Sequence, residues 1–534
     1  MNNMVEQAIR SAGNKVRAKP LPAAKTRSKA WLAASVLCLV AGVGVAIYLA
    51  LGGLHEPEAA IISNGAFAII RVPAGGNFQA ALDRAKPGDT IELAAGSTFK
   101  GKFRLPNKPG AEFITVRTSA SDDQLPPAGK RLDYKKYAAV LPKIVSNIKG
   151  EPALTTATSA HHFRFIGVEF GPTIEGLYNI IEIGTTEESA IEQIPHHIEF
   201  DRVALLGDPK WGQRRGIAAN GKFIKIENSY FADFKRDGEE SQAIAVWATD
   251  GPIEIINNYL EAAAENILFG GAQNSLGLVA ADCIIRDNHL NKPIEWKGTK
   301  WNVKNFIEIK SGRRIKIENN LMTNNWQMAQ EGTGVLFRTA EDSGKQAVVE
   351  DIEFTNNIMR GSGSALNIFG GEGKGGRNLT IRNNIFEDIS GKKYDGRGFF
   401  IKSTTFTNVI IENNTVIHDG SITLAYGDPV KGFIFRNNIV FNNEYGFFGD
   451  TVGPGKPALA TYFPGAVITN NIIVGGKASD YGTSNFYPPA IGQIGFVDTA
   501  KGNYQLDPGS PYVKKGIGGK SVGATLDPRT VGGR

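Results

Sequence analysis

The chain has 534 residues and a hydrophobic fraction of 42%, which is enough for one large repeat domain or two to three ordinary domains. Its formal net charge of +6 belongs to residues 1–30, where seven basic residues stand against one acidic residue. The remaining residues carry 52 charges of each sign. The body therefore lacks the basic excess typical of nucleic-acid binding, and we expect no nucleic-acid partner.

An uncharged, apolar stretch at residues 30–54 follows a basic tail at residues 1–29. Its length predicts one transmembrane helix, and the tail predicts a cytoplasmic N-terminus. A cleaved signal peptide is the alternative, but its apolar core is usually only about 7–15 residues long. We therefore predict a signal anchor in the inner (cytoplasmic) membrane, a linker at residues 55–70 and a body in the periplasm or outside the cell. Cleavage of the span would give a secreted protein.

A short helix and a strand are predicted at residues 75–93, GGNFQAALDRAKPGDTIEL. Asn77 is suited to cap an amphipathic helix that runs to about Lys86. The Pro-Gly pair that follows predicts a turn. Such a capping helix can cover the open end of a β-structure and protect its edge.

Ten short segments between residues 198 and 471 repeat one pattern at intervals of 24 to 37 residues. Each alternates apolar and polar residues, which places one face of a strand in a core. One such strand cannot bury its face alone, so we predict coils of ~25–30 residues that stack into parallel sheets. The segments are IEFDRV (198–203), IKIENS (224–229), IEIINN (253–258), CIIRDN (283–288), IKIENN (315–320), IEFTNN (352–357), LTIRNN (379–384), VIIENN (409–414), FIFRNN (433–438) and AVITNN (466–471).

The asparagines predict how each strand ends, and the residues between the copies predict further strands in each coil. Asn tolerates the left-handed backbone conformation of a sharp corner, and identical Asn residues on successive coils can form an amide ladder. Leucine-rich repeats and propellers do not fit the composition and spacing. Residues 495–516 are expected to form a terminal coil. Further strands are expected between the copies, at 265–271, 306–312, 334–340, 365–371 and 398–404.

Two histidine pairs, His161-His162 and His196-His197, precede strands on two coils. Their repetition at a corner predicts stacking between coils, and their positions do not have the spacing of a metal-binding motif. Cys283 is the one cysteine after residue 54. Burial and hydrogen bonds, rather than an intramolecular disulfide, must therefore hold the body together.

The sequence resembles right-handed parallel β-helix proteins of the pectin-lyase-like superfamily. The resemblance rests on the Asn-Asn strand ends, on VPAGGNFQAALDRAKPGDTIELAAG (72–96) and on YQLDPGSPYVKKG (504–516). It implies an all-β, right-handed parallel β-helix (solenoid) at residues 71–525 and a C-terminal tail at residues 526–534. It also implies a polysaccharide partner, mostly an acidic one, although fold does not fix activity. We expect a monomer.

The stretch FIEIKSGRRIKIENN (306–320) is similar to the alginate and chondroitin lyase branch of that superfamily. In that branch Ca²⁺, held by carboxylates and Asn, neutralises the substrate carboxylate. A Lys removes the C5 proton, and an Arg assists the leaving oxygen. The similarity implies Lys310 as the base and Arg338 as the assisting cation. It implies Ca²⁺ or substrate ligands at Glu265, Asn266 and Glu308.

The spacing of these residues permits one site. Glu308 and Lys310 share a strand face, which is the outer face if Ile307 and Ile309 point inward. Like positions on successive coils lie ~4.8 Å apart. The chain departs from the branch at Lys310, where a second acid is usual, and at Thr339, where a His often follows the Arg. Without a site, the same charges would form a solvated ladder.

Loops and aromatic residues bear on the choice between functions. Loops at 206–216, 236–242, 292–304 and 339–347 would wall a groove in a lyase, whereas a scaffold would leave a flat charged face. Tryptophans in or near these loops could bind substrate by stacking on sugar rings, or could anchor the loops. They are Trp247, Trp296, Trp301 and Trp326.

We therefore predict a polysaccharide lyase, or the related uronan C5-epimerase, that acts on a uronate-containing glycan. The first alternative is a non-catalytic carbohydrate-binding or cell-envelope scaffold. The second, with less support from residues, is a glycoside hydrolase that uses dispersed carboxylates such as Asp237, Glu239 and Glu240.

Overall fold

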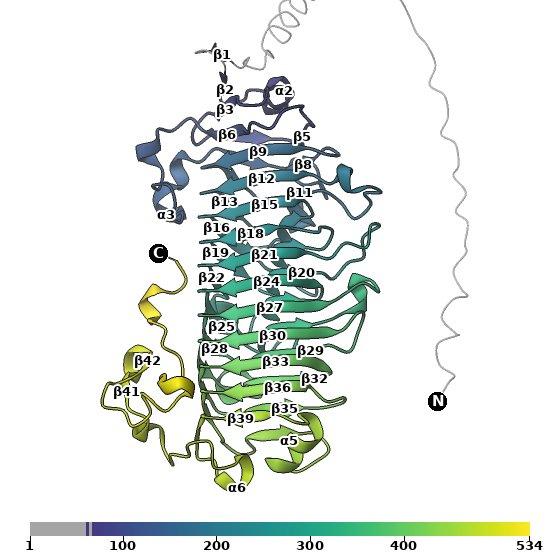
Figure 1. Cartoon of the computed structure of the whole chain (residues 1–534). Coiled ribbons are helices and arrows are strands. Elements are labelled where there is room, and N and C mark those ends of the chain that lie inside the picture. The colour runs from purple at the N-terminus through teal and green to yellow at the C-terminus, as the bar shows by residue number, and fades with distance from the viewer. Residues whose placement is uncertain (1–59, 64–66, 534) are drawn as a thin grey trace, which may run out of the picture. The chain divides into compact units, whose positions relative to one another are not determined.

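The computed structural model describes residues 60–63 and 67–533, which form three long sheets with one strand from each coil (Figure 1). Sheet A has 15 strands, sheet B has 13 and sheet C has 12. Neighbouring strands within these sheets are parallel, except for β1 and β2 of sheet A. The predicted all-β parallel β-helix is confirmed, and each coil adds a third strand to the two that the sequence predicts.

Sheet A contains all ten repeated segments. Their alternation is realised as expected, since the apolar positions face the core and the polar positions face outward. Its strands are β1 (Ala60–Ser63), β2 (Ala68–Val72), β3 (Thr90–Leu93), β6 (Ile114–Thr118), β9 (His161–Ile166), β12 (His196–Asp201), β15 (Lys222–Glu227), β18 (Ile253–Ile256), β21 (Ala281–Arg286), β24 (Gly312–Glu318), β27 (Val349–Thr355), β30 (Gly376–Arg382), β33 (Phe406–Glu412), β36 (Lys431–Arg436) and β39 (Val467–Thr469).

Sheet B follows the asparagine corner. Its strands are β4 (Thr98–Lys100), β7 (Lys143–Val145), β10 (Glu169–Phe170), β13 (Ala204–Leu206), β16 (Tyr230–Phe234), β19 (Tyr259–Ala262), β22 (His289–Asn291), β25 (Leu321–Asn325), β28 (Ile358–Ser362), β31 (Ile385–Ile389), β34 (Thr415–His418), β37 (Ile439–Phe441) and β40 (Ile472–Val474).

Sheet C contains the strands predicted between the repeats. They are β5 (Phe103–Leu105), β8 (Leu154–Thr156), β11 (Asn179–Ile183), β14 (Arg215–Ala219), β17 (Gln242–Val246), β20 (Glu265–Phe269), β23 (Asn305–Ile309), β26 (Thr333–Arg338), β29 (Ser364–Phe369), β32 (Ile401–Thr404), β35 (Thr423–Ala425) and β38 (Phe447–Gly449).

The two asparagines that end a sheet A strand have different structural roles. Asn319 has a φ of 56°, the left-handed conformation that turns the chain. Asn320 is fully buried, and its Nδ2 donates to Asn357 Oδ1 at 3.0 Å. The predicted amide ladder is therefore present. It runs through Asn258, Asn288, Asn320, Asn357, Asn384, Asn414, Asn438, Asn471 and Asn485.

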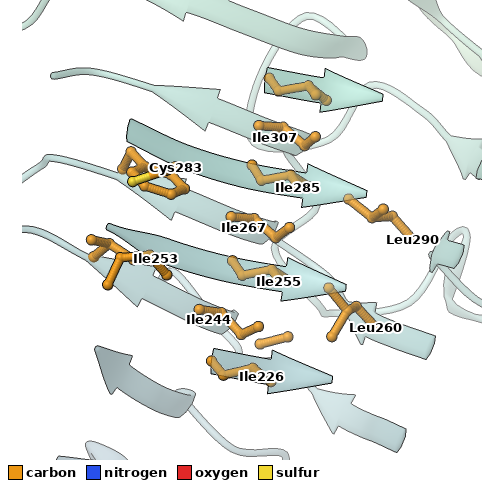
Figure 2. Packing of buried hydrophobic residues seen from close by; sticks show 14 of the residues in the cluster. Ile226, Ile244, Ile253, Ile255, Leu260, Ile267, Cys283, Ile285, Leu290 and Ile307 are labelled. Atoms are coloured by element: carbon orange, nitrogen blue, oxygen red, sulfur yellow. The ribbon is translucent and has the colours of Figure 1, made fainter. Parts of the chain in front are cut away.

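The core between the sheets is built from stacked branched side chains. Figure 2 shows Ile226, Ile255 and Ile285 from successive coils one above another, opposite Ile244 and Ile267. Each is essentially unexposed, and burial of one such side chain stabilises the fold by about 1.5–3 kcal/mol. The stacking fixes the register of every strand and therefore the positions of outward-facing side chains.

A short helix, α2 (Phe78–Arg84), packs at the N-terminal end of the described coils (Figure 1). Asn77 caps it, since its side chain accepts from the Ala80 amide at 2.8 Å. Phe78 and Leu82 join the main core.

The predicted anchor at residues 30–54 and the basic tail lie outside the described residues. Among the residues that the structure describes, no helix is both long enough and apolar enough to cross a membrane.

The other end of the coil stack differs from the expectation. Residues 495–516 do not form a terminal coil, because β41 (Phe496–Asp498) and β42 (Asn503–Leu506) pair with each other in an antiparallel hairpin. The chain then packs against the corner between sheets A and B. The remaining α-helices are α3 (Tyr134–Tyr137), α4 (Gly391–Tyr394), α5 (Lys456–Tyr462) and α6 (Ala478–Tyr481).

Candidate functional site

Charged side chains gather around Lys304 on the outer face of sheet C. Lys304 Nζ lies 2.6 Å from Glu240 Oε1, 2.6 Å from Glu265 Oε1 and 3.6 Å from Glu308 Oε2. The Lys304 side chain is 7% exposed, and those of Glu265 and Glu308 are 0% and 1% exposed. Buried charges must be paired to be tolerated. Lys304, Glu265 and Glu308 therefore form a shielded network, which the partly exposed Glu240 joins from outside.

The strand register explains why Glu308 belongs to this network. Ile307 and Ile309 lie in the core, so the residue between them points outward, as predicted. Glu308 stands beside Leu268 of β20 and Leu336 of β26 in the register of sheet C. Because coils and loops cover it, this outward-facing carboxyl is nonetheless removed from water.

The network shifts the proton affinities of its members in different directions. Burial, followed by the nearby Glu265 carboxylate, raises the pKa of Glu308 to about 7. Burial also acts to raise the pKa of Glu240, but Lys304 outweighs it and the pKa is lowered. Burial acts to lower the pKa of Lys304, and the three carboxylates outweigh it and raise this pKa. Glu308 therefore holds its proton more tightly than an ordinary carboxyl group does.

Lys310 and Arg338 lie beside this network and are more exposed. Lys310 Nζ is 2.7 Å from Asp342 Oδ2, and its side chain is 16% exposed. Burial acts to lower the pKa of Lys310, but Glu308 and Asp342 outweigh it and raise this pKa, so Lys310 is protonated at neutral pH. Arg338 Nη2 lies 3.5 Å from Glu372 Oε1, and its side chain is 43% exposed.

Asn266 is separated from the carboxylates, although it is adjacent to Glu265 in sequence. Its Nδ2 donates to the Leu260 carbonyl at 2.7 Å, and its Oδ1 accepts from Lys292 Nζ at 3.2 Å. Lys292 is fully buried, and burial lowers its pKa to about 7 despite the opposing effect of Glu265. Its Nζ also donates at 2.9 Å to the carbonyls of Ala262, Ala263, Ala264 and Asn305.

This arrangement does not fit the calcium ligand set that the resemblance implies. Ca²⁺ takes six to eight oxygen ligands, whereas the Lys304 ammonium already lies between Glu265 and Glu308. The Asn266 oxygen accepts from Lys292 instead of facing that position. The three residues therefore belong to two lysine sites and do not form this ligand set.

Three of the predicted tryptophans form a buried cluster under the loops. Trp296, Trp301 and Trp326 are 6%, 8% and 2% exposed and pack with Tyr394. The Nζ of Lys235 lies 4.8 Å and 5.2 Å from the ring centroids of Trp296 and Trp301. Their faces are covered, so these residues anchor loops rather than present a stacking surface for sugars.

Trp247 has a different environment. It is half-buried, and the Arg215 guanidinium lies 5.2 Å from its ring centroid. Arg215 Nε donates to Gln242 Oε1 at 2.8 Å, and Gln242 Nε2 donates to Glu265 Oε2 at 2.7 Å. Trp247 therefore stays a predicted substrate contact, linked to the Lys304 network through two side chains.

The predicted wall loops supply several residues of the site. The loop at 236–242 contributes Glu240 and Gln242, the loop at 292–304 contributes Lys304, and the loop at 339–347 contributes Asp342. Sequence reasoning missed their roles because the repeat pattern does not align loops. The available signal was Lys304, which stands four residues before Glu308 on the segment that enters β23.

The same outer face continues toward the C-terminal coils and becomes hollow. A row of outward positions runs from Glu308 through Leu336, Asn367 and Lys402 to Leu424 and Phe448. The hollow has a volume of about 470 Å³. Its lining includes Lys392, Arg397, Phe399, Leu424, Tyr445 and Phe448. The face thus offers both charge and aromatic surface along several coils.

Comparisons with known proteins agree with this architecture. The family model for a right-handed β-helix region matches residues 242–453. None of the curated proteins matches the chain. Among solved structures, the chain is similar to the PL6 family alginate lyase AlyGC, with 16% identity and a TM-score of 0.49. That match covers 87% of this chain and 59% of the alginate lyase, so the chain spans less than two thirds of that protein's length.

Two other solved structures show the range of similar proteins. A mannuronic acid specific polysaccharide family 6 lyase from the human gut microbiota has 12% identity and a TM-score of 0.43, with coverage of 79% of this chain and 82% of that one. PfbA, a surface adhesin of Streptococcus pneumoniae, has 11% identity and a TM-score of 0.44, with coverage of 72% and 89%. The three stacked parallel sheets, together with the family match, show that this chain folds as a right-handed parallel β-helix.

Proposed function

We propose that the outer face of sheet C binds an acidic, uronate-containing polysaccharide and that the protein cleaves it by β-elimination or inverts it at C5. The observation that carries this proposal is the buried Glu265–Lys304–Glu308 network beneath the more exposed Lys310 and Arg338. Exposed cations attract sugar carboxylates. Removal of a C5 proton also requires a general base, and neighbouring charges must adjust the pKa of that base toward the working pH.

Lys310 and Arg338 are the groups that a bound sugar can touch. In the proposal Lys310 takes the C5 proton, and Arg338 offsets the negative charge that develops on the leaving oxygen. Lys310 must first be neutral, and both Glu308 and Asp342 favour its charged form. Protonation of Glu308 near pH 7 would remove its negative charge, so that only Asp342 would still raise the pKa of Lys310. Glu265, Lys304 and Glu308 thus act as positioning residues.

The test is turnover by the purified full-length protein on alginate, pectate, chondroitin and related uronans, each with and without Ca²⁺. Elimination gives an unsaturated uronate that absorbs ultraviolet light, and epimerisation in D₂O gives deuterium at C5. We expect Lys310→Ala to lower turnover by about 10²-fold or more. Lys300→Ala is the matched control, because Lys300 forms an exposed pair with Asp237 at 3.8 Å. Equal turnover in both variants would contradict the assignment.

A second candidate is a non-catalytic carbohydrate-binding or cell-envelope scaffold. It is favoured by the ion pairs of the exposed cations, since Lys310, Arg338 and Lys402 each already have a carboxylate partner. Saturable binding of a uronan without turnover, weakened by Arg338→Ala, would support this candidate over the lyase.

A glycoside hydrolase has less support from the geometry. Such enzymes hold the scissile bond between two carboxyl groups, whereas the Lys304 ammonium occupies the space between Glu240 and Glu265. Asp237 and Glu239 form exposed ion pairs with Lys300 and Arg214 instead.

The proposed location follows from the sequence. We propose that residues 30–54 anchor the protein in the inner membrane, which would place the β-helix in the periplasm beside envelope or imported glycans. Protease treatment of spheroplasts should then degrade the β-helix while intact cells protect it. Recovery of the full chain in the cytosolic fraction would contradict this location.

A further inference from the structure

Two consecutive coils of sheet A begin with paired histidines that face each other. His161 and His162 open β9, His196 and His197 open β12, and His196 is the register partner of His161. The rings of His161 and His196 are stacked with centroids 4.8 Å apart, and those of His162 and His197 with centroids 4.6 Å apart. The predicted stacking between coils is confirmed.

The backbone brings neighbouring histidines to one side of the strand. Successive side chains of a regular strand point to opposite faces. Here His162 and His197 have φ values of 55° and 53°, in the left-handed region that costs free energy for a residue with a Cβ. As a result, His161 Nδ1 lies 2.8 Å from His162 Nδ1, and His196 Nδ1 lies 2.7 Å from His197 Nδ1.

We propose that these four histidines bind one divalent metal ion of the class that prefers imidazole, represented by Zn²⁺, Ni²⁺ and Cu²⁺. Neutral imidazole nitrogens are the ligands that such ions take. Possible ligand atoms of His162, His196 and His197 all lie within 4.8 Å of one another. His161 joins them through its contact with His162.

The distances within each histidine pair suit a metal, and rotation of the stacked rings is needed to bring both pairs to it. At metal–nitrogen distances of about 2.0–2.1 Å, two ligands at a right angle lie about 2.9 Å apart and two opposite ligands about 4.2 Å apart. The contact within each pair is close to the first value. The rings of His161 and His196 are parallel, with an interplanar angle of 1°, and their lone pairs lie in the ring planes, so these partly exposed side chains must rotate to direct both pairs at one ion.

The surroundings hold the rings without occupying the ligand position. Phe113 meets His162 edge-on at 5.1 Å, and Phe223 stacks on His197 at 4.5 Å. Glu199 forms an ion pair with Arg164 at 2.5 Å, which connects the same two coils.

A metal at this position would connect two coils near the N-terminal part of the stack. Among the described residues Cys283 is the one cysteine and is free, so covalent cross-links are absent from this part of the chain. A metal that binds only the folded state stabilises it by an amount that grows with the logarithm of the metal concentration once this exceeds the dissociation constant. The metal would thus cross-link β9 to β12, as a disulfide cross-links two segments of an exported protein.

The experiment is calorimetric titration of the full-length protein, prepared without a polyhistidine tag, with ZnCl₂. We expect one strong equivalent, an increase of several degrees in the thermal midpoint, and neither effect with CaCl₂ or MgCl₂. Cu²⁺ in place of Zn²⁺ should give an electron paramagnetic resonance spectrum with splitting from several imidazole nitrogens. This spectrum is recorded on the unmodified chain and does not depend on the folding of a variant.

Variants identify the ligands. His162→Gln and His196→Gln, each altering a different coil, should weaken Zn²⁺ binding by at least tenfold. His289→Gln is the matched control, because His289 lies in β22 and its Nε2 contacts Thr323 Oγ1 at 2.8 Å. Absence of a strong equivalent in the unmodified protein would overturn the proposal. Undiminished binding in both histidine variants, with near-ultraviolet circular dichroism unchanged, would also overturn it.

Discussion

Glu308 shows how its surroundings determine the chemistry of one side chain. Its place between Ile307 and Ile309 turns it outward, and the loops around Lys304 remove it from water. The Lys304 and Lys310 cations favour its ionised form, whereas burial and Glu265 favour its protonated form, and the second pair prevails.

This raised pKa predicts how stability depends on pH. The pKa of Glu308 rises from an ordinary value of 4.5 to about 7 on folding, so the folded state binds this proton more tightly than the unfolded state. The stabilisation is complete below about pH 4.5 and is lost as the pH rises through about 7. Relative to Glu308→Gln, the wild type should lose about 1–3 kcal/mol of unfolding free energy between these limits.

Urea unfolding of the two proteins at about pH 5 and about pH 8 measures this difference. Glu239→Gln is the control, since Glu239 is a partly exposed carboxylate paired with Arg214 at 3.6 Å. A constant difference between wild type and Glu308→Gln across this range would show that Glu308 titrates at an ordinary pKa.

At the scale of the elements, the asparagine corner joins each strand of sheet A to sheet B. Asn320 donates to the carbonyls of Ile285 and Glu318 at 2.9 and 3.0 Å, as well as to Asn357 Oδ1. Its own Oδ1 accepts from the backbone amide of Asn288 at 3.0 Å. The side-chain amide of Asn320 therefore forms hydrogen bonds with groups on its own coil and on the coils before and after it.

Asn320→Ala should destabilise the protein by about 2–4 kcal/mol, because several buried polar groups lose their partners together. The measurement is the midpoint of chemical unfolding. Asn319→Gly is the matched variant one residue earlier, since glycine adopts the left-handed conformation of Asn319 without strain, and its cost should stay below about 1 kcal/mol. Equal losses in the two variants would contradict separate roles for the two asparagines.

The repeat pattern predicts what is common to all coils, and it fails where single residues depart from the pattern. The strands of sheets A and C, the asparagine ladder and the outward direction of Glu308 all follow from alternation and burial. Asn266 was predicted beside Glu265, but its bonds to Lys292 and Leu260 turn it inward. The left-handed φ of His162 likewise has no signal in the sequence, so the stacking of the histidines between coils could be predicted but the close approach of His161 to His162 could not.

Loops were the other source of error, and the reason is physical. The positions of Lys304 and Glu240 depend on how loops of different coils pack, which the strand period does not describe. Trp296, Trp301 and Trp326 are in or near those loops, and burial of their large apolar faces stabilises the loops more than exposure would. The three tryptophans that were predicted to contact substrate are therefore buried inside the loops beside the candidate site.

At the scale of the described molecule, the C-terminal segment returns along the asparagine corner of earlier coils (Figure 1). Asn413 Nδ2 donates to the Ser521 carbonyl at 3.1 Å, and the Thr525 amide donates to Asn383 Oδ1 at 2.8 Å. The Gly532 amide donates to the Asn319 carbonyl at 2.9 Å. The coils of β24, β30 and β33 are thus also joined from outside by one continuous segment.

Removal of residues 520–534 should destabilise these coils selectively. Ile358 and Ile385 are each 1% exposed because Leu526 and Val531 cover them, and exposing two such side chains costs about 3–5 kcal/mol. In a stack where each coil contacts only its neighbours, the loss should stay local. Amide hydrogen exchange should therefore accelerate in β24 to β33, whereas β12 and β15 should keep their protection.

Arg529→Ala is the control for this truncation, because the Arg529 side chain is 81% exposed and pairs with Asp527 in the same segment. It should leave exchange in β24 to β33 unchanged. If the truncated protein instead loses protection evenly from β12 to β36, the coils unfold as one cooperative unit, and the C-terminal segment stabilises the whole stack. If protection is unchanged throughout, the apolar contact with Ile358 and Ile385 adds nothing to the stability of the strands beneath it.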